Sequence, residues 1–423
     1  MLMQGPEPGA RTPLDEIDLF DPVRFRTVPP HPIWHTLRAE APVWRQARPG
    51  QPAFWNVTRY DDVVRIVKDT ARYSSTHGNV LDVAEHGDSA GGLTMPLMDP
   101  PDHGQVRGPA IRTMSTQVVR RRSEGVRRRI RRLLEPALAG ETVDFAQIML
   151  HLPMLAVGEI LGVPEEVWQD IPGWTMAGVA PQDPVYAQGS NERTLRRAHY
   201  QLFAMFSKLI AERRRAPKDD LISLLTQLEV NGRKFDDQQV LLNCYSMVMG
   251  ANTTTPHVAG HLILALAENP DAWRMVLADP ELVSGCVEEA LRWATPTNHV
   301  MRRTTTDVEI DGVRIGEGEI VAAWIGSANR DESVFEDPYR FRPDRKPNPH
   351  LAFSLGAHYC IGGPAARSLL NVLVEELAAT FSAFEIDGTV EHLASNFING
   401  LTRLPIRPVL RHDAPVALAA SGA

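Results

Sequence analysis

The chain has 423 residues, of which 43% are hydrophobic and 23% charged, as in ordinary globular proteins. Its net charge of −8 disfavours a nucleic-acid partner, which usually demands a basic domain. No window of about 18 apolar residues predicts a membrane span, and the N-terminus lacks the pattern of a signal peptide. Three scattered cysteines are too few for a disulfide framework, so we expect a cytoplasmic protein without a membrane anchor.

Both ends of the chain predict disordered tails. Residues 1–15 are rich in proline and glycine, and residues 413–423 are rich in alanine. No glycine/serine linker divides residues 16–412, which we therefore expect to form a single domain.

The first part of the domain predicts a small sheet beside helices. Residues 33–42 and 60–67 have helical patterns, and residues 43–45 and 53–58 read as short strands. Residues 74–98 are irregular, and long irregular segments of compact domains are usually functional or disordered.

A double proline then opens a helix in Asp99-Pro-Pro-Asp-His-Gly-Gln-Val-Arg107. His103 and Arg107 are four residues apart, so they lie on one helical face and can bind one anionic group together. Eight arginines follow between Arg120 and Arg132. Most of this run is typical of a solvated face, although a local basic patch could steer an acidic protein partner.

The longest helical pattern covers residues 236–268 and has no Asp, Glu, Lys or Arg from Val240 to Ala267, which predicts a helix through the core. Gly250-Ala-Asn-Thr-Thr-Thr-Pro256 interrupts it, because Pro256 offers no N–H to the carbonyl of Asn252. The break predicts either a plain proline kink relieved by a hydroxyl or a functional site.

After the long helix, the sequence predicts a pair of charged residues on one helical face and a β-hairpin. Glu289 and Arg292 are placed on one helical face. Residues 308–315 predict a hairpin that turns at Asp311-Gly312. Asn298 and His299 could face a pocket or be satisfied within their loop, and the sequence leaves both open.

Phe353-Ser-Leu-Gly-Ala-His-Tyr-Cys-Ile-Gly-Gly363 places Cys360 in a glycine-rich loop just before a helical pattern. A thiolate is a metal ligand, and its pKa falls beside a metal or at a helix N-terminus. The glycines allow the backbone to approach a large planar ligand closely. The absence of a CxxC pair argues against structural zinc, and the remaining alternative is a buried free cysteine.

This loop resembles the haem-binding loop of the cytochrome P450 family, and further family motifs recur from about Leu19 to Leu410. The resemblance implies the cytochrome P450 fold, mostly α with a small β lobe. It also implies haem b (iron protoporphyrin IX) as the cofactor, with Cys360 as the metal ligand. The other haem-binding residues that it implies are His358, His103, Arg107, Arg302, Phe353 and Gly362.

The resemblance also implies roles around the haem. It makes Gly250, Asn252 and Thr253 the catalytic residues, with Thr253 as hydrogen-bond donor to dioxygen. Asn252 replaces the usual acid, so protons would pass through waters or Thr253. The implied structural network is Glu289, Arg292 and Arg340, and the implied substrate pocket is Ala251, Asn298, His299, Val300 and Phe397.

The function expected from this resemblance is monooxygenation, in which O2 and electrons convert an apolar small molecule to an alcohol or epoxide. The substrate would be a secondary metabolite or terpenoid. A ferredoxin-type redox partner with its reductase would supply electrons to a monomeric chain, since no flavin or nicotinamide motif occurs in it. Asn252 also admits oxidative coupling, desaturation or peroxide-driven oxidation. A non-catalytic haem sensor is the further alternative, which Thr253 in the broken helix disfavours.

Overall fold

The computed structural model describes residues 5–7, 10–114 and 123–412. Residues 1–4 and 8–9 of the predicted N-terminal tail, the whole predicted C-terminal tail, and Arg120, Arg121 and Arg122 of the arginine run lie outside this description. Within the predicted N-terminal tail, the backbone N–H of Thr12 donates to Thr36 Oγ1 at 2.9 Å. The described chain therefore contacts the domain before residue 16.

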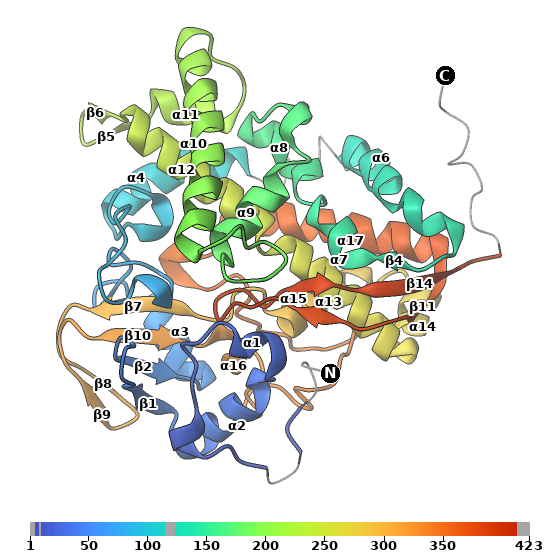
Figure 1. Cartoon of the computed structure of the whole chain (residues 1–423), viewed down its shortest axis with the longest axis horizontal. Helices are drawn as coiled ribbons and strands as arrows, with labels where there is room; N and C mark the ends of the chain where they lie inside the picture. Colours follow the sequence, from blue (N-terminus) through green and yellow to red (C-terminus); the bar gives the residue numbers. More distant parts are fainter. Residues whose placement is uncertain (1–4, 8–9, 115–122, 413–423) are drawn as a thin grey trace.

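The fold is mostly helical with a small β-rich lobe, which lies at the lower left of Figure 1. The α-helices are α1 Arg24–Thr27, α2 Pro30–Glu40, α3 Tyr60–Lys68, α4 Asp102–Thr113, α6 Ser123–Leu134, α7 Phe145–Leu150, α8 Met154–Leu161, α9 Ile171–Val179, α10 Asn191–Arg215, α11 Leu221–Gln227, α12 Asp237–Asn252, α13 Thr255–Glu268, α14 Pro270–Ala278, α15 Leu282–Ala294, α16 Ile325–Ala328 and α17 Gly363–Thr380. The short 3₁₀ helices are η1 Leu14–Glu16, η2 Leu81–Val83, η3 Met95–Leu97, η4 Glu135–Ala139, η5 Glu165–Val167 and η6 Gly356–His358. None of the described helices combines the length and apolar character that crossing a membrane requires.

The strands form one five-stranded sheet and several smaller ones. They are β1 Val43–Gln46, β2 Phe54–Val57, β3 Tyr73–Ser74, β4 Val143–Asp144, β5 Glu229–Val230, β6 Arg233–Lys234, β7 Val300–Thr304, β8 Val308–Ile310, β9 Val313–Ile315, β10 Ile320–Ala323, β11 Phe381–Ile386, β12 Glu391–His392, β13 Leu401–Arg403 and β14 Pro405–Leu410. The large sheet has the order β1-β2-β10-β7-β3, in which only the β2–β10 pair is parallel.

Local sequence signals account for several of these elements. The predicted β8–β9 hairpin is confirmed, and Asp311 and Gly312 have φ angles of 48° and 75°. A two-residue turn of this kind needs both central residues at positive φ, which Asp-Gly tolerates. The predicted strands in residues 43–45 and 53–58 are confirmed as β1 and β2.

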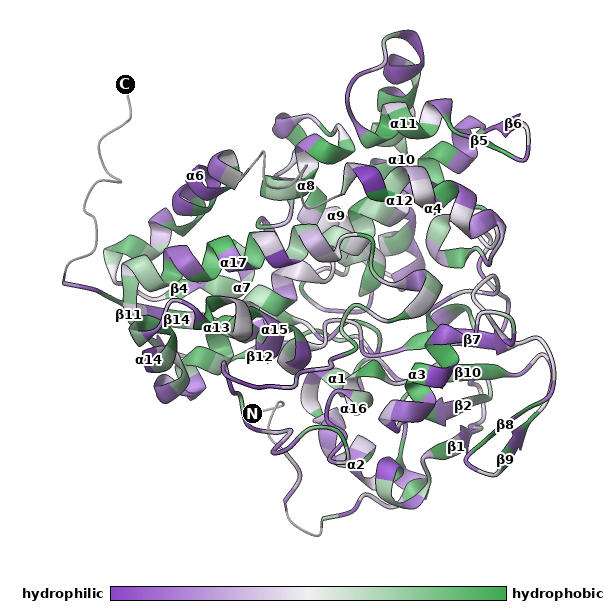
Figure 2. Cartoon of the chain, turned by 180° about the vertical axis from the view of Figure 1, so that it is seen from behind, coloured by the Kyte–Doolittle hydropathy of each residue, from purple (hydrophilic) through white to green (hydrophobic). Residues whose placement is uncertain are grey.

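The long apolar helix runs through the core in two pieces, α12 and α13 (Figure 1). The predicted break is confirmed: α12 ends at Asn252 and α13 begins at Thr255, with Pro256 in its first turn. Most of α13 is buried in the largest hydrophobic cluster, whereas α6 is mostly hydrophilic on the outside (Figure 2).

A buried ion network joins α15 to the segment that leads into the cysteine loop. Glu289 and Arg292 are fully buried, and Arg292 Nη2 lies 2.8 Å from Glu289 Oε1. Arg345 Nε lies 3.1 Å from the same carboxylate. Arg292 also donates to the backbone carbonyls of Asn329 and Pro338, at 3.0 and 2.9 Å.

The prediction that the Arg340 side chain completes this network is wrong. Arg340 is exposed and contributes only its backbone carbonyl, which accepts a hydrogen bond from Arg345 Nη2 at 2.9 Å. Arg345 is the second guanidinium: its Nε donates to Glu289 at 3.1 Å and its Nη1 donates to the carbonyl of Glu336 at 2.6 Å.

We expect Arg345→Met to lower the free energy of unfolding by about 3 kcal/mol, because it removes the hydrogen bonds from Arg345 to the Glu289 carboxylate and to the carbonyls of Glu336 and Arg340 and leaves acceptors unpaired. The exposed Arg340→Met should change it by less than about 0.5 kcal/mol. Denaturant unfolding of both variants measures the difference, and equal midpoints would contradict the assignment of Arg345 to the network.

Candidate functional site

The loop of residues 353–363 is held in shape by its own backbone. The N–H of Cys360 donates to the carbonyl of Phe353 at 2.8 Å, and the N–H of Gly363 donates to the carbonyl of Cys360 at 3.2 Å. Gly356 has a φ of 69°, and a Cβ there would lie 3.2 Å from the carbonyl oxygen of Val67. The loop therefore packs against the end of α3 at a place that only glycine allows.

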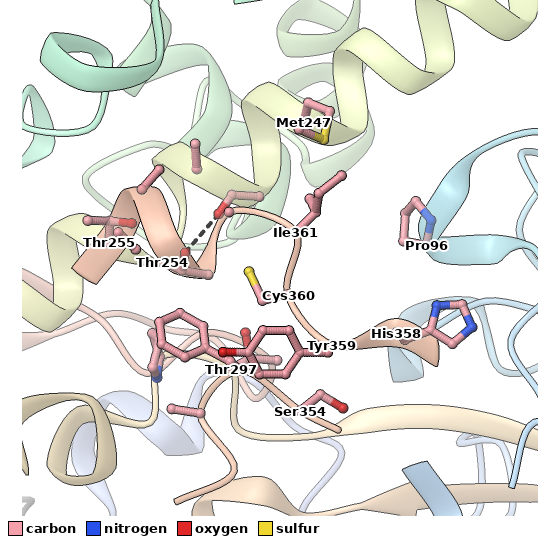
Figure 3. A pocket seen from close by; sticks show the side chains of 18 of the residues that line it. Pro96, Met247, Thr254, Thr255, Thr297, Ser354, His358, Tyr359, Cys360 and Ile361 are labelled. Atoms are coloured by element: carbon pink, nitrogen blue, oxygen red, sulfur yellow. Dashed lines mark hydrogen bonds between the residues drawn. The ribbon is translucent and has the colours of Figure 1, made fainter. Parts of the chain in front are cut away.

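The sulfur of Cys360 points into a cavity of about 320 Å³ below the junction of α12 and α13. Figure 3 shows it between Thr254 and Thr255 on one side and His358 on the other. Burial raises the pKa of the Cys360 thiol, whereas the backbone N–H groups of Gly362 and Gly363 and the Arg107 guanidinium lower it. A cation bound at the sulfur would add to these effects and favour the thiolate.

The predicted anion-binding side chains converge at this cavity. His103 and Arg107 from α4, Arg302 from β7 and His358 all line it. The rings of His103 and His358 have centroids 4.5 Å apart, and Arg107 donates to the carbonyl of Tyr359. Among the described residues, neither Arg107 nor Arg302 forms an ion pair with a carboxylate.

The charges in this group are set by burial. Burial and Arg302 lower the pKa of His358 to about 3, and burial followed by Arg107 lowers the pKa of His103. Burial also lowers the pKa of Arg302 to about 10, which still leaves it charged at neutral pH. Two guanidinium groups without carboxylate partners, beside neutral imidazole donors, suit a ligand with two carboxylates.

These features fit haem. Cys360 would hold the iron, the propionates would lie at Arg107, Arg302 and the two histidines, and the remaining cavity wall is largely apolar. Phe353 and Gly362 also line the cavity as predicted. Phe353 stacks under the guanidinium of Arg367, whose carbon lies 4.4 Å from the ring centroid.

The expectation that Thr253 and Asn252 face this cavity is wrong. The wall contributed by α12 and α13 contains Gly250, Ala251, Thr254 and Thr255, and neither Thr253 nor Asn252. Thr253 Oγ1 instead donates to the carbonyl of Met249 at 2.9 Å. The helical phase explains the difference, because Thr254 is four residues after Gly250 and therefore shares its face.

Asn252 is buried on the other side of α12. Its Nδ2 donates to the carbonyl of Val248 at 2.9 Å and lies 3.4 Å from the sulfur of Met154. Its Oδ1 has no hydrogen-bond partner among the described residues. Asn252 therefore does not occupy the cavity position of an acid, and among the described residues the α12–α13 wall has no Asp or Glu.

The predicted substrate pocket is partly correct in position. Ala251, Val300 and Phe397 line the cavity, but Asn298 and His299 do not. Asn298 Nδ2 donates to the carbonyl of Asn396 at 3.2 Å, and His299 Nδ1 lies 3.3 Å from the same oxygen. Asn298 is therefore bonded within its loop, whereas His299 is bonded through Nδ1 alone and its buried Nε2 has no partner among the described residues.

The irregular segment 74–98 also reaches the cavity, through Asn79, Met95 and Pro96. Sequence reasoning missed Thr254, Ser246 and Thr297 as lining residues. The sequence does contain a signal for Thr254. Met247, Gly250, Thr254 and Val258 are spaced three or four residues apart, so they lie on one helical face, and all four line the cavity.

Comparison with known proteins gives consistent results. The family model described as cytochrome P450 matches residues 173–408. The chain is 34% identical to cytochrome P450 NovI of Streptomyces niveus, covering 93% of this chain and 97% of that one. It is 30% identical to linalool 8-monooxygenase of Pseudomonas putida, covering 93% and 99%. The crystal structure of P450 OxyD, described as involved in the biosynthesis of vancomycin-type antibiotics, superposes with a TM-score of 0.83 at 32% identity, covering 93% and 100%.

We expect Arg302→Met to weaken haem binding about tenfold to hundredfold, because a charge-assisted hydrogen bond contributes about 1.5–3 kcal/mol. Arg303→Met is the matched control, since Arg303 is the next residue of β7 but is exposed and donates to the carbonyl of Gly318. Titration of the apoprotein with haem measures both affinities. Equal affinity of the Arg302 and Arg303 variants would exclude the propionate role.

Proposed function

The chain belongs to the cytochrome P450 family, and we propose that it is a monooxygenase that oxidises an apolar small molecule with O2 and electrons from a separate redox protein. The observation that carries this proposal is the sulfur of Cys360 at the wall of a largely apolar cavity that also holds Arg107 and Arg302.

When bound, haem with a thiolate ligand supplies oxygen activation, because the thiolate pushes electron density toward the iron and favours O–O cleavage. The residues of the chain have separate tasks around it. Cys360 would bind the iron, while Arg107, Arg302 and the two histidines would hold the propionates. The apolar wall excludes water and binds the substrate by its apolar surface.

Thr254 is the residue that we assign to proton transfer at the cavity. In the structure, its Oγ1 donates a hydrogen bond to the carbonyl of Gly250 at 2.7 Å. A hydroxyl can rotate, accept a hydrogen bond from water and donate its own hydrogen to an oxygen atom in the cavity. Thr254 thus takes the place that we expected for Thr253.

For the substrate we propose a secondary metabolite or terpenoid, hydroxylated or epoxidised. The support is the similarity to a linalool monooxygenase and to a protein of antibiotic biosynthesis. The cavity wall is mostly apolar but also includes the polar side chains of Asn79, Ser246 and Thr297. Such a wall suits an apolar substrate that carries a polar group.

For the partner we propose a ferredoxin-type protein with its reductase, acting on a monomer in the cytoplasm. The arginines of α6 are weaker support for an acidic partner than the sequence suggests, because several of them pair with carboxylates of this chain. Arg127 and Arg131 pair with Glu376 of α17, and Arg129 pairs with Glu159 of α8. Much of the described positive charge is therefore neutralised within the chain.

A second candidate is peroxide-driven oxidation. It is favoured by one observation, namely that the described α12–α13 wall of the cavity carries no carboxylate to deliver protons.

We expect Thr254→Ala to lower the ratio of product to reductant consumed roughly tenfold, because a positioned proton donor contributes about 10²–10⁴ in rate. Thr253→Ala should keep the wild-type ratio, since that hydroxyl bonds a backbone carbonyl away from the cavity. The ratio is measured with a chemical or protein reductant. If the two variants exchange these results, the assignment of Thr254 is wrong, and if neither changes the ratio, the peroxide-driven route is the better one.

A further inference from the structure

A short part of the irregular segment before α4 is held against α12 by a buried amide. Asn243 of α12 is fully buried, and its side chain donates to the carbonyl of Leu93 and accepts from the backbone N–H of Met95, both at 3.0 Å. Thr94, which lies between these two peptide groups, is extended, with φ −129° and ψ 143°. In an extended residue the preceding carbonyl and the following N–H point to the same side, so one amide can bond both.

The side chain of Thr94 reaches the next polar residue of the same helix. Thr94 Oγ1 donates to Ser246 Oγ at 3.0 Å, whereas its other acceptors, the carbonyl of Leu242 and Asn243 Oδ1, are farther away at 3.4 and 3.5 Å. Ser246 Oγ in turn donates to the carbonyl of Asn243 at 2.9 Å. The hydrogen bonds therefore run in one direction, from Thr94 to Ser246 and from Ser246 to the backbone of α12.

This direction decides what Ser246 offers to a ligand. A serine hydroxyl has one hydrogen and two lone pairs, and in Ser246 the hydrogen and one lone pair are already used within the protein. Ser246 lines the main cavity, whereas neither Thr94 nor Asn243 does. The cavity is therefore offered one hydrogen-bond acceptor at this point. A hydroxyl or N–H group can bond it, but an ether or ketone oxygen would meet a lone pair instead of a donor.

The acceptor lies away from the residues that we assign to the chemistry. Ser246 is four residues before Gly250, about 6 Å along the axis of α12. The hydroxyl of Thr254 bonds the Gly250 carbonyl, one further turn along the chain. Figure 3 shows Met247, the neighbour of Ser246, and Pro96, which follows Met95, on the side of the cavity away from Thr254. A group that bonds Ser246 is thus more than one helical turn from Thr254.

We propose that Ser246 selects the substrate by accepting a hydrogen bond from a hydroxyl or N–H group, and that Thr94 and Asn243 keep it an acceptor. The proposal rests on the proposed function and narrows its substrate class to apolar molecules that carry such a donor at the end remote from the carbon to be oxidised. Thr94 and Asn243 are positioning residues, because both act through Ser246. A site built to bond a donor discriminates against an analogue that lacks it.

The test measures the binding of paired probes to the haem-loaded full chain. The probes are 1-(ω-hydroxyalkyl)imidazoles of increasing chain length and their ω-methoxy analogues. The imidazole nitrogen of each probe ligates the haem iron, so that binding is followed by the absorption spectrum, and the chain length searches for the position of Ser246. At the matching length we expect the wild type to bind the hydroxyl probe about three- to tenfold more tightly than the methoxy probe, as one neutral hydrogen bond contributes.

Variants of the network separate its members. Ser246→Ala should abolish the preference for the hydroxyl probe and leave the affinity for the methoxy probe almost unchanged, while Ser246→Thr, which keeps the hydroxyl, should retain the preference. Thr94→Val should weaken it, because the released Ser246 hydroxyl can rotate and donate to the ether oxygen. Thr297→Val is the matched control, since Thr297 also lines the cavity but lies outside the network, and it should keep the wild-type preference.

The proposal is overturned if the wild type prefers the hydroxyl probe at no chain length, or if the preference survives Ser246→Ala. Loss of the preference in Thr297→Val with its retention in Ser246→Ala would overturn it as well and assign the acceptor to Thr297. If Ser246→Ala fails to fold with haem, Ser246→Cys takes its place, because a thiol is a weak acceptor. Binding requires no turnover, so absence of product from the wild type would refute the proposed function, while the affinity ratios still decide the role of Ser246.

Discussion

The structure depends on a sulfur atom that burial alone would keep protonated. Burial raises the pKa of Cys360, and the N–H groups of Gly362 and Gly363 together with Arg107 offset this only in part. A thiolate at this position needs a bound cation, and iron in turn needs the thiolate as its ligand. The loop that carries Cys360, the cavity and the cationic residues that line it are what a site for a thiolate-bound iron requires.

The fold makes the loop rigid through contacts that begin far from it in sequence. Arg292, which is paired with Glu289, donates to the carbonyls of Asn329 and Pro338 at either end of a segment without regular structure. The side chain of Asn329 then accepts the backbone N–H of Leu351 at 2.7 Å, just before the cysteine loop begins. Burying these ions costs desolvation free energy. In return, the network fixes the position of the segment that leads to Cys360.

The parts that could be predicted from sequence are those with short, regular spacing. The Cys360 loop and the broken core helix are of this kind, because glycine and proline act locally. The resemblance implies Thr253, whereas the helical spacing from Gly250 indicates Thr254, because the position of a residue in a motif does not fix which face of the helix it occupies. The resemblance likewise implies Arg340 rather than Arg345, and an irregular segment has no period from which the direction of either side chain could be predicted. The choice in each case depended on long-range packing.

The most direct test of this account is the absorption spectrum of the reduced, CO-bound protein. We expect the long-wavelength Soret band of thiolate-ligated haem in the wild type and in Cys286→Ala, which changes a buried cysteine of α15 far from the loop in sequence. The band should be lost in Cys360→Ser, because a serine hydroxyl is not ionised enough at neutral pH to replace the thiolate. A thiolate band that persists unchanged in Cys360→Ser would contradict the central claim.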